Sequence, residues 1–506
     1  MSDQPTTPPA AGPQDDLPEQ MRVRREKLDR LRAQGVDPYP IGFPRTTTVA
    51  ELRTSYPELA PDTRTGDRAA IAGRVMLSRT GGKLCFATLR DGSGELQVML
   101  SLDALGEERL AAWKADVDLG DHVGVEGEVV TSRRGELSIM VDRWAFTAKA
   151  LRPLPDKHKG LSDPEARVRM RYVDFIVNED SRRLMRDRAT VLRSVRATLH
   201  AQDYLEVETP QLQLLHGGAA ARPFTTHLHA FDQEMYLRIA LELYLKRMVV
   251  GGFERVYEIG RNFRNEGVDA THSPEFTMLE VYQAYGDYHT MATLTRDIVL
   301  DAARALGGTV ISDGHGGEID LEAEWRYLPI HQAVSEAVGE EVDVKTSVEA
   351  LNKLADRHDV ALQPGWRAGD IVLELFEKLV EHTLLAPTFV MDYPVEVRPL
   401  AKAHRSVPGL VEAWDLIIGG VELAPAYSEL NDPVEQRRRL VEQSLKAAGG
   451  DPEAMQLDED FLRAMEYGMP PMGGMGLGID RLVRLLTGAH SIRETIAFPL
   501  LKPERD

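Results

Sequence analysis

The chain has 506 residues, of which 43% are hydrophobic, and this is enough to bury the cores of about three domains of ~150 residues each. Its formal net charge of −20 argues against non-specific affinity for nucleic acid, so any RNA has to meet a locally basic surface. The single cysteine, Cys85, excludes an intramolecular disulfide and a zinc site built from cysteines.

The N-terminal residues carry two signals. Residues 1–16 are rich in Pro, Gly and Ala without periodicity, which predicts a disordered tail. No signal-peptide centre and no run of ~18 apolar residues is present, so we expect a cytoplasmic protein without a membrane span. Residues 17–65 form an extension that opens with a basic amphipathic helix and a stop at Gly35. The basic side chains of this helix either contact RNA or form an ordinary solvated face.

Five short strand patterns fall within residues 66–150. They lie at 69–77, 84–90, 95–100, 122–130 and 136–146, and a helical pattern separates the third from the fourth. This order predicts a five-stranded Greek-key barrel of the OB type, a fold that commonly grips single-stranded nucleic acid with aromatic platforms and cationic groups. The pattern alone leaves Phe86 open between a core residue and such a platform.

A larger domain is expected after the barrel. Residues 151–180 are proline-punctuated and then basic, which predicts a linker to a domain at 181–506. Apolar spacing predicts a helix over 182–201, followed by a strand that Pro210 ends. A second helix is expected over 241–250, and the region 300–400 reads as helical insertions around the core.

The stretch 258–285 contains a charged strand, a loop and a second strand with period-2 alternation. One face of the second strand carries Phe276, Met278, Glu280 and Tyr282. A ring, a carboxylate and a phenol in a row suit a ligand with one flat apolar part and one cationic part. Arg264 precedes this strand, and its planar donors suit a phosphate or a carboxylate. A surface ladder of charge pairs would give a similar pattern.

Six motifs extend this pattern over the larger domain. They are VETP (207–210), GGAAARPF (217–224), FRNEG (263–267), HSPEFTMLEVY (272–282), AYSELNDP (426–433) and GMGLGIDRL (474–482). Together they resemble the class II aminoacyl-tRNA synthetases in their lysine-specific form, over most of residues 70–502. The resemblance implies an α+β fold, in which an OB barrel precedes a catalytic domain with a central antiparallel β-sheet flanked by helices. It also implies a homodimer built on the motif that ends in VETP.

The resemblance implies a lysine–tRNA ligase activity. Lysine and ATP give lysyl-adenylate and pyrophosphate, and the 3′ end of tRNA(Lys) then takes the lysyl group. The substrate carboxylate itself attacks the α-phosphorus, so the enzyme supplies positioning and charge neutralisation. Two alternatives stay open: a paralogue that transfers lysine or an analogue to a protein or lipid, and an inactive RNA-binding protein. The barrel favours tRNA as the acceptor.

The resemblance also assigns roles to individual residues. The catalytic pair is Arg264, at the attacking carboxylate and the α-phosphate, and Arg481, at the γ-phosphate. Lysine is expected to contact Gly218, Glu242, Arg264, Glu280, Tyr282 and Glu429. ATP is expected to contact Arg264, Glu266, His272, Phe276 and Arg481. Asp415 and Glu422 are expected to bind the Mg²⁺ cofactor. The anticodon is expected to contact Arg79, Phe86, Gln97 and Glu136.

Four residues depart from the family's pattern. Asp203 stands where Gly is usual and Asp415 where Glu is usual, while Arg398 and Pro425 replace a usual Ser and Asn. The last two put the pocket for the substrate's α-carboxylate in question. Our hypothesis is that Arg398 reaches this carboxylate and compensates for a donor lost at Pro425.

The strand that carries Pro425 raises a geometric problem. Glu422 and Glu429 are an odd number of residues apart, so a regular strand would point them to opposite faces. We therefore predict an irregular strand near 424–427, because proline is tolerated in strands mainly at edges and bulges.

Overall fold

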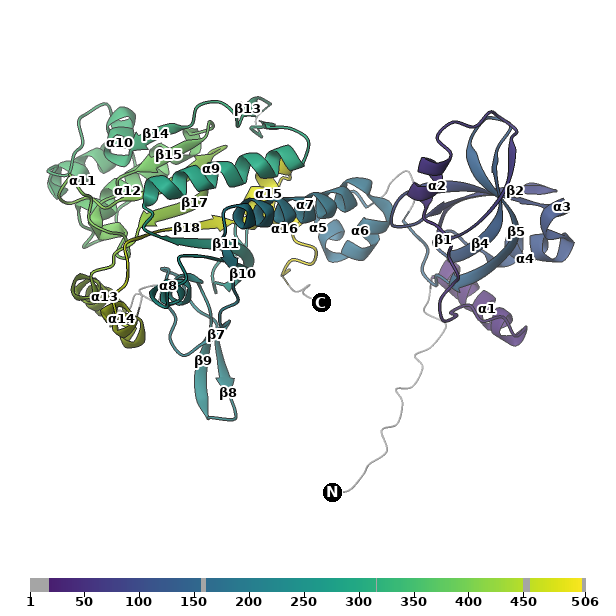
Figure 1. Ribbon diagram of the computed structural model, residues 1–506, viewed down its shortest axis with the longest axis horizontal. Coiled ribbons are helices and arrows are strands. Elements are labelled where there is room, and N and C mark those ends of the chain that lie inside the picture. The colour runs from purple at the N-terminus through teal and green to yellow at the C-terminus, as the bar shows by residue number, and fades with distance from the viewer. Residues whose placement is uncertain (1–17, 156–160, 315, 449–455, 503–506) are drawn as a thin grey trace, which may run out of the picture. The chain divides into compact units, whose positions relative to one another are not determined.

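The computed structural model describes residues 18–155, 161–314, 316–448 and 456–502, so the predicted tail at 1–16 lies outside the described residues. The chain divides into two compact units, Met1–Gly160 and Leu161–Asp506 (Figure 1). This division falls inside the predicted linker. Residues after it are helical, in α5 (Pro164–Arg169) and α6 (Arg171–Val177). The buried Arg171 pairs with Asp174 of the same helix at 2.7 Å and donates a hydrogen bond to the carbonyl of residue 494 at 2.5 Å, which joins α6 to the second unit. This part of the predicted linker at 151–180 is therefore helical and is not an extended connection.

The first unit is a closed barrel with the strand order β1-β2-β3-β5-β4, as predicted for an OB fold. Its strands are β1 (Arg64–Arg79), β2 (Leu84–Arg90), β3 (Glu95–Ser101), β4 (His122–Thr131) and β5 (Leu137–Ala148). Helices α3 (Leu102–Leu105) and α4 (Glu107–Asp116) separate β3 from β4. Alternate residues such as Cys85, Ala87 and Leu89 point inward and form the barrel core.

Helix α1 (Glu19–Ala33) uses much of its predicted basic face to hold the barrel. Arg24 donates hydrogen bonds to the carbonyls of residues 119, 150 and 152. The Lys27 ammonium lies 2.7 Å from Asp118, and Arg30 pairs with Asp116. Fewer cations of this helix are thus available to RNA than its sequence indicates. A second short helix, α2 (Val49–Ser55), follows it in the extension.

The second unit is built on one eight-stranded sheet. Its order is β14-β15-β16-β17-β18-β11-β10-β6, antiparallel except for the parallel pairs β14–β15 and β10–β6 at its two edges. The strands are β6 (Leu205–Glu206), β10 (Arg255–Phe263), β11 (Glu275–Ala284), β14 (Arg326–Pro329), β15 (Thr388–Met391), β16 (Ala413–Ile418), β17 (Val421–Ser428) and β18 (Met472–Gly478). The region 300–400 thus supplies two strands of the sheet as well as helices.

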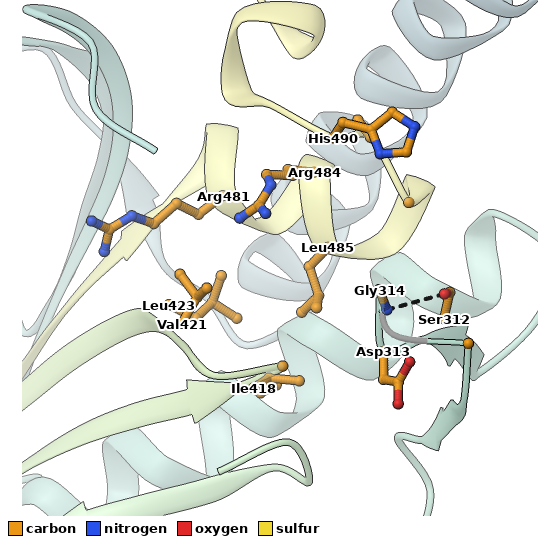
Figure 2. A pocket seen from close by; sticks show the side chains of 14 residues that line it. Ser312, Asp313, Gly314, Ile418, Val421, Leu423, Arg481, Arg484, Leu485 and His490 are labelled. Atoms are coloured by element: carbon orange, nitrogen blue, oxygen red, sulfur yellow. Dashed lines mark hydrogen bonds between the residues drawn. The ribbon is translucent and has the colours of Figure 1, made fainter. Parts of the chain in front are cut away.

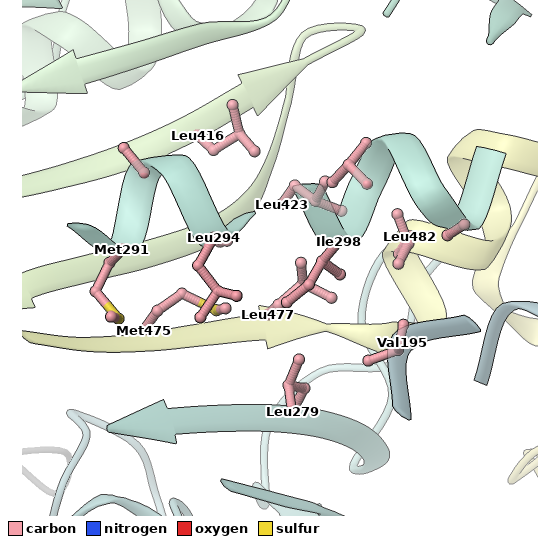
Figure 3. Close-up of a cluster of buried hydrophobic side chains, with 14 of the residues drawn as sticks. Val195, Leu279, Met291, Leu294, Ile298, Leu416, Leu423, Met475, Leu477 and Leu482 are labelled. Atoms are coloured by element: carbon pink, nitrogen blue, oxygen red, sulfur yellow. The ribbon is translucent and has the colours of Figure 1, made fainter. Parts of the chain in front are cut away.

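Helices cover both faces of this sheet. On one face lie α7 (Glu179–Ala201), α9 (Tyr288–Ala305) and α15 (Ile479–Thr487), whose apolar side chains join those of the strands in the main core. Figure 3 shows Leu294 and Ile298 of α9 with Leu477 of β18 in this core. On the other face lie α8 (Glu242–Val250) near β10 and β11, and α10 (Ile330–Val338), α11 (Val348–Arg357) and α12 (Ala368–Leu379) near β14–β16. The second face carries the site described below.

The remaining elements are short or peripheral. They are β7 (Leu212–Gln213), β8 (Thr225–Leu228), β9 (Gln233–Leu237), β12 (Val310–Ser312), β13 (Glu318–Asp320), α13 (Pro433–Ala448), α14 (Glu459–Glu466) and α16 (Ile492–Thr495). The turn before β6 explains Asp203, whose φ of 59° lies in the left-handed region that glycine, and less readily Asp, adopts. Among the described residues, no helix is long and apolar enough to cross a membrane.

Candidate functional site

Strand β11 presents the two faces that its sequence predicts. Leu279 and Val281 enter the main core, so Glu280 and Tyr282 point to the opposite face, toward α8. Glu280 is 6% exposed and accepts a hydrogen bond from the backbone N–H of Leu241, 3.0 Å away, at the start of α8. The Tyr282 hydroxyl donates to the second oxygen of Glu280 at 3.1 Å. Burial, aided by the nearby Glu242, raises the pKa of Glu280 to about 7.

A buried lysine joins two of the predicted site carboxylates. The Lys246 ammonium lies 2.5 Å from Glu242 and 2.6 Å from Glu429, and its side chain is 0% exposed. The two carboxylates raise the pKa of Lys246 against the effect of burial, so this group stays an ammonium. From the sequence we predicted only a helix over 241–250, with no role for Lys246 in the site. The spacing of four residues from Glu242 signals half of this contact, but nothing local signals Glu429.

Two glycines shape the walls around these carboxylates. A Cβ at Gly474 of β18 would lie 2.0 Å from a Glu429 oxygen and 2.4 Å from the Tyr282 ring. Gly218 has φ +83°, and a Cβ there would lie 3.1 Å from Glu242. Both positions therefore need a residue without a side chain. From the sequence we predicted a place in the lysine site for Gly218 but not for Gly474.

A β-bulge in β17 resolves the spacing of Glu422 and Glu429. The register with β16 shifts between Leu416 and Ile417, which pair with residues 424 and 422. Leu423 is the extra residue, and it shares the main core with residues 424 and 426. Glu422 thereby returns to the face of Glu429. The predicted irregularity exists, but it lies just before the predicted span 424–427.

Arg264 and Phe276 lie together at the end of the β10–β11 hairpin. The Arg264 guanidinium sits 5.2 Å from the centre of the Phe276 ring. Burial lowers the pKa of Arg264, and the charge of Arg481 adds to this lowering while three glutamates oppose it. Glu266 follows in the loop and accepts the backbone N–H of residue 222 at 3.3 Å. His272 is more remote, because it lies in the exposed part of the loop with its Nδ1 2.9 Å from Asp269.

Arg481 projects from the first turn of α15. Its Nη1 donates to the backbone carbonyl of Glu422 at 2.7 Å. Figure 2 shows Arg481 at the edge of a cavity of about 330 Å³, whose wall also includes Arg484, Val421 and Leu423. The structure thus brings Arg481, Arg484 and the start of β17 to one region, an arrangement that suits an anion.

Arg398 has a different partner from the one we expected. Its guanidinium pairs with Asp415 at 2.5 Å and stacks 4.4 Å from the centre of the Tyr393 ring. Because Asp415 holds it, the hypothesis that Arg398 reaches the substrate's carboxylate is not supported by this geometry. Pro425 pairs with Asp415 across β16–β17, and the ladder between β17 and β18 begins only at residue 426. Proline is therefore accommodated next to a bulge, where one ladder ends.

The barrel carries the other candidate residues on its outer face. Phe86 is half-buried and lies opposite Arg79 on β1 and Met99 on β3. Gln97 donates a hydrogen bond to Ser138 at 2.9 Å. Glu136 is exposed, 3.3 Å from an arginine of α2. Since its strand neighbours Cys85 and Ala87 face inward, Phe86 is not part of the barrel core.

Comparison with known proteins agrees with both units. Residues 69–145 match the OB-fold nucleic acid binding domain, and residues 163–502 match the class II tRNA synthetases for D, K and N. The chain is therefore a class II aminoacyl-tRNA synthetase, with the helical cover, the large sheet and the buried carboxylates described above.

Full-length relatives narrow this class. The lysine–tRNA ligase of Mycolicibacterium gilvum is 55% identical over 96% of this chain and 98% of its own length. That of Mycobacterium tuberculosis H37Rv is 53% identical over 98% and 99%. The lysylphosphatidylglycerol biosynthesis bifunctional protein LysX of Mycobacterium marinum is 53% identical over 97% of this chain but only 44% of its own length. The chain belongs to the lysyl-tRNA synthetase family, and the relatives that it matches over their full length are lysine–tRNA ligases.

Proposed function

We propose that this enzyme activates L-lysine with ATP and transfers the lysyl group to tRNA(Lys) in the cytoplasm. The observation that carries this proposal is the buried group of Glu242, Glu280 and Glu429, with the Tyr282 hydroxyl among them. A buried ammonium costs several kcal/mol unless anions and hydrogen bonds replace its water. Lysine has two ammonium groups, and this pocket offers carboxylates on both α8 and the sheet.

Recognition of lysine follows from the positions of these groups. The ε-ammonium suits Glu280, Tyr282 and Glu429, which lie close together. The first two stand on the face of β11 that points away from the main core, and Glu429 follows the last residue of β17. Glu242 and the backbone of Gly218 suit the α-amino group, because they face each other where α8 begins. An analogue without one amine would leave a carboxylate unpaired, which polar sites reject by about 10⁴-fold or more.

Activation needs charge neutralisation at the α-phosphate. Arg264 suits the attacking carboxylate and the α-phosphate, and Arg481 suits the γ-phosphate, since both lie near Glu422 at the start of β17. Phe276 offers a ring for adenine. Glu266 and His272 are assigned to ATP from the family's motif. His272 would have to move with its loop, because its ring is exposed and held by Asp269.

Mg²⁺ fits the remaining carboxylates in part. Oδ1 of buried Asp415 accepts no hydrogen bond within the described part of the chain, whereas its Oδ2 is held by Arg398. Glu422 is half-exposed and close enough to raise the pKa of Asp415. Mg²⁺ typically takes one or two carboxylates together with substrate phosphates, so Asp415 Oδ1 and Glu422 would hold it. When bound, it would supply positive charge beside the phosphates.

The outer face of the barrel is proposed to bind the anticodon. Phe86 offers a half-buried ring for stacking, with Arg79 across from it on the neighbouring strand. Gln97 and Glu136 add hydrogen-bonding groups on the same barrel. Such a surface would read single-stranded bases while the catalytic unit handles the 3′ end.

We also propose a homodimer. The edge strand β6 and the segment after it expose apolar side chains: Leu205 is 46%, Leu212 48% and Leu214 60% exposed. Exposed apolar patches of this kind mark interaction surfaces. Sedimentation at micromolar concentration should give the mass of two chains, and Leu205→Asp with Leu214→Asp should give the mass of one.

The acceptor is the second point to test, because LysX carries a comparable segment in a protein named for lysylphosphatidylglycerol biosynthesis. The enzyme should be incubated with labelled lysine, ATP and either tRNA(Lys) or phosphatidylglycerol vesicles. We expect label on the tRNA and none on the lipid. Adenylate formation without charged tRNA would overturn the proposal and favour the other acceptor.

A further inference from the structure

We propose that Lys246 is a positioning residue that holds Glu242 and Glu429 in place and sets the charge of the pocket to match a substrate with two ammonium groups. The inference rests on the proposed lysine site. Lys246 is itself enclosed, with 0% of its side chain exposed, so it does not offer its ammonium to the substrate.

The geometry supports a bridging role. The Lys246 ammonium is 2.5 Å from Glu242, on the same helix, and 2.6 Å from Glu429, just beyond the end of β17. It lies 6.0 Å from the centre of the Tyr282 ring. One ammonium therefore ties α8 to the sheet between the two carboxylates that we assign to opposite ends of lysine. Both carboxylates are more than 90% buried, so water screens their ion pairs with Lys246 only weakly.

The charges around Lys246 can be counted element by element. Helix α8 contributes Glu242, strand β11 contributes Glu280 with the neutral Tyr282, and the end of β17 contributes Glu429. When the substrate's ammonium groups are bound, they favour the ionised form of all three carboxylates, and three carboxylates with one internal ammonium then leave two negative charges, one for each ammonium group of lysine. Arg264 faces the same region and is balanced by the substrate's own carboxylate. Without Lys246 the pocket would carry one uncompensated charge.

The expected response to removing Lys246 is a change with pH. Burial and Glu242 raise the pKa of Glu429, and Lys246 is the neighbour that lowers it. Without this ammonium, Glu429 would keep its proton to higher pH, and a neutral carboxyl cannot balance the substrate's ammonium. Lysine binding should then be weakest at low pH and recover as the pH rises.

The test is lysine-dependent pyrophosphate exchange from pH 6.5 to 8.5 with Lys246→Met, Lys246→Arg and Lys149→Met. Lys149 is a matched control, because it is another fully buried lysine that bridges two carboxylates, but it lies in the barrel unit. At pH 7, Lys246→Met should raise the KM for lysine on the order of 10²-fold, with the KM for ATP within about threefold. The increase should shrink toward pH 8.5. Lys246→Arg should keep the wild-type pH profile, and Lys149→Met should change neither KM.

The outcomes separate this inference from the proposed function. Absence of lysine-dependent exchange in the wild type would contradict the proposed function. Normal exchange in the wild type, with a lysine KM or pH profile unaltered by Lys246→Met, would overturn the role of Lys246. If Lys246→Met does not fold, Lys246→Met with Glu242→Gln removes both partners of the pair. Its pH profile must then differ from that of Glu242→Gln alone, and identical profiles would also overturn the inference.

Discussion

A substitution at Gly474 tests the structure of the proposed lysine pocket most directly. The change Gly474→Ala adds a single methyl group in β18, between Tyr282 on β11 and Tyr427 on β17. The new carbon would lie 2.0 Å from a Glu429 oxygen and 2.4 Å from the Tyr282 ring, whereas ordinary contacts are 3.4–4 Å. Both Glu429 and Tyr282 therefore have to move away from the new carbon by about 1 Å or more, and a shift of this size costs roughly 10²-fold in catalysis.

The assay should separate lysine from ATP. We expect Gly474→Ala to raise the KM for lysine about 10²-fold in pyrophosphate exchange, equivalent to about 2.7 kcal/mol, with the KM for ATP nearly unchanged. Gly476→Ala is the matched control on the same strand, because the one tight contact of its Cβ would be the flexible end of Met278 at 3.2 Å, while Glu280 and Pro425 would lie at the ordinary distances of 3.7 and 4.0 Å. It should change each KM by less than about threefold. A folded Gly474→Ala enzyme with a normal KM for lysine would refute the placement of Glu429 and Tyr282 in the pocket.

Four further predictions follow from individual residues. Glu429→Gln should lower kcat/KM for lysine by about 10²-fold while the Kd for ATP, measured by calorimetry, stays the same. An equal loss of affinity for ATP would mean that Glu429 is wrongly assigned to the lysine site. Phe86→Ala should raise the KM for tRNA by roughly 5- to 150-fold and spare pyrophosphate exchange, because stacking contributes about 1–3 kcal/mol per base. Arg398→Met should destabilise the second unit by about 3 kcal/mol in urea unfolding, because it leaves buried Asp415 without its partner; unchanged stability would contradict that pairing. Because the pKa of Glu280 is about 7, the folded state holds this proton more tightly than the unfolded chain, so without lysine stability should fall from pH ~4.5 to pH ~7. Lysine should then raise the Tm more at pH 8 than at pH 6, and the reverse order would contradict the assignment of Glu280.

Alternation along strands was readable from the sequence. The period-2 pattern of β11 predicted which side chains face the site, because a buried strand with one functional face leaves that signature. The odd spacing of Glu422 and Glu429 predicted an irregular β17 for the same reason. Its position was wrong by one or two residues, because the core accepts Leu423 and residue 424 side by side, and no local pattern reveals that packing.

Contacts between segments that are far apart in the sequence could not be predicted from it. The bond from Lys246 to Glu429 and that from Arg398 to Asp415 join elements that meet only in the folded sheet. The helices at 164–177 were missed because prolines and basic residues dominate that stretch, whereas the ion pairs of Asp174 that stabilise them depend on burial. The outward orientation of Phe86 could not be predicted from the strand pattern, because the closure of the barrel decides which side each strand residue faces.

Pyrophosphate exchange with each of the twenty amino acids tests the central claim most directly. The wild-type enzyme should exchange pyrophosphate into ATP with lysine and, at equal concentration, at least about 10⁴-fold less with amino acids that lack a second ammonium group. Strong exchange with another amino acid, or none with lysine, would contradict the assignment of the buried carboxylates as a lysine pocket.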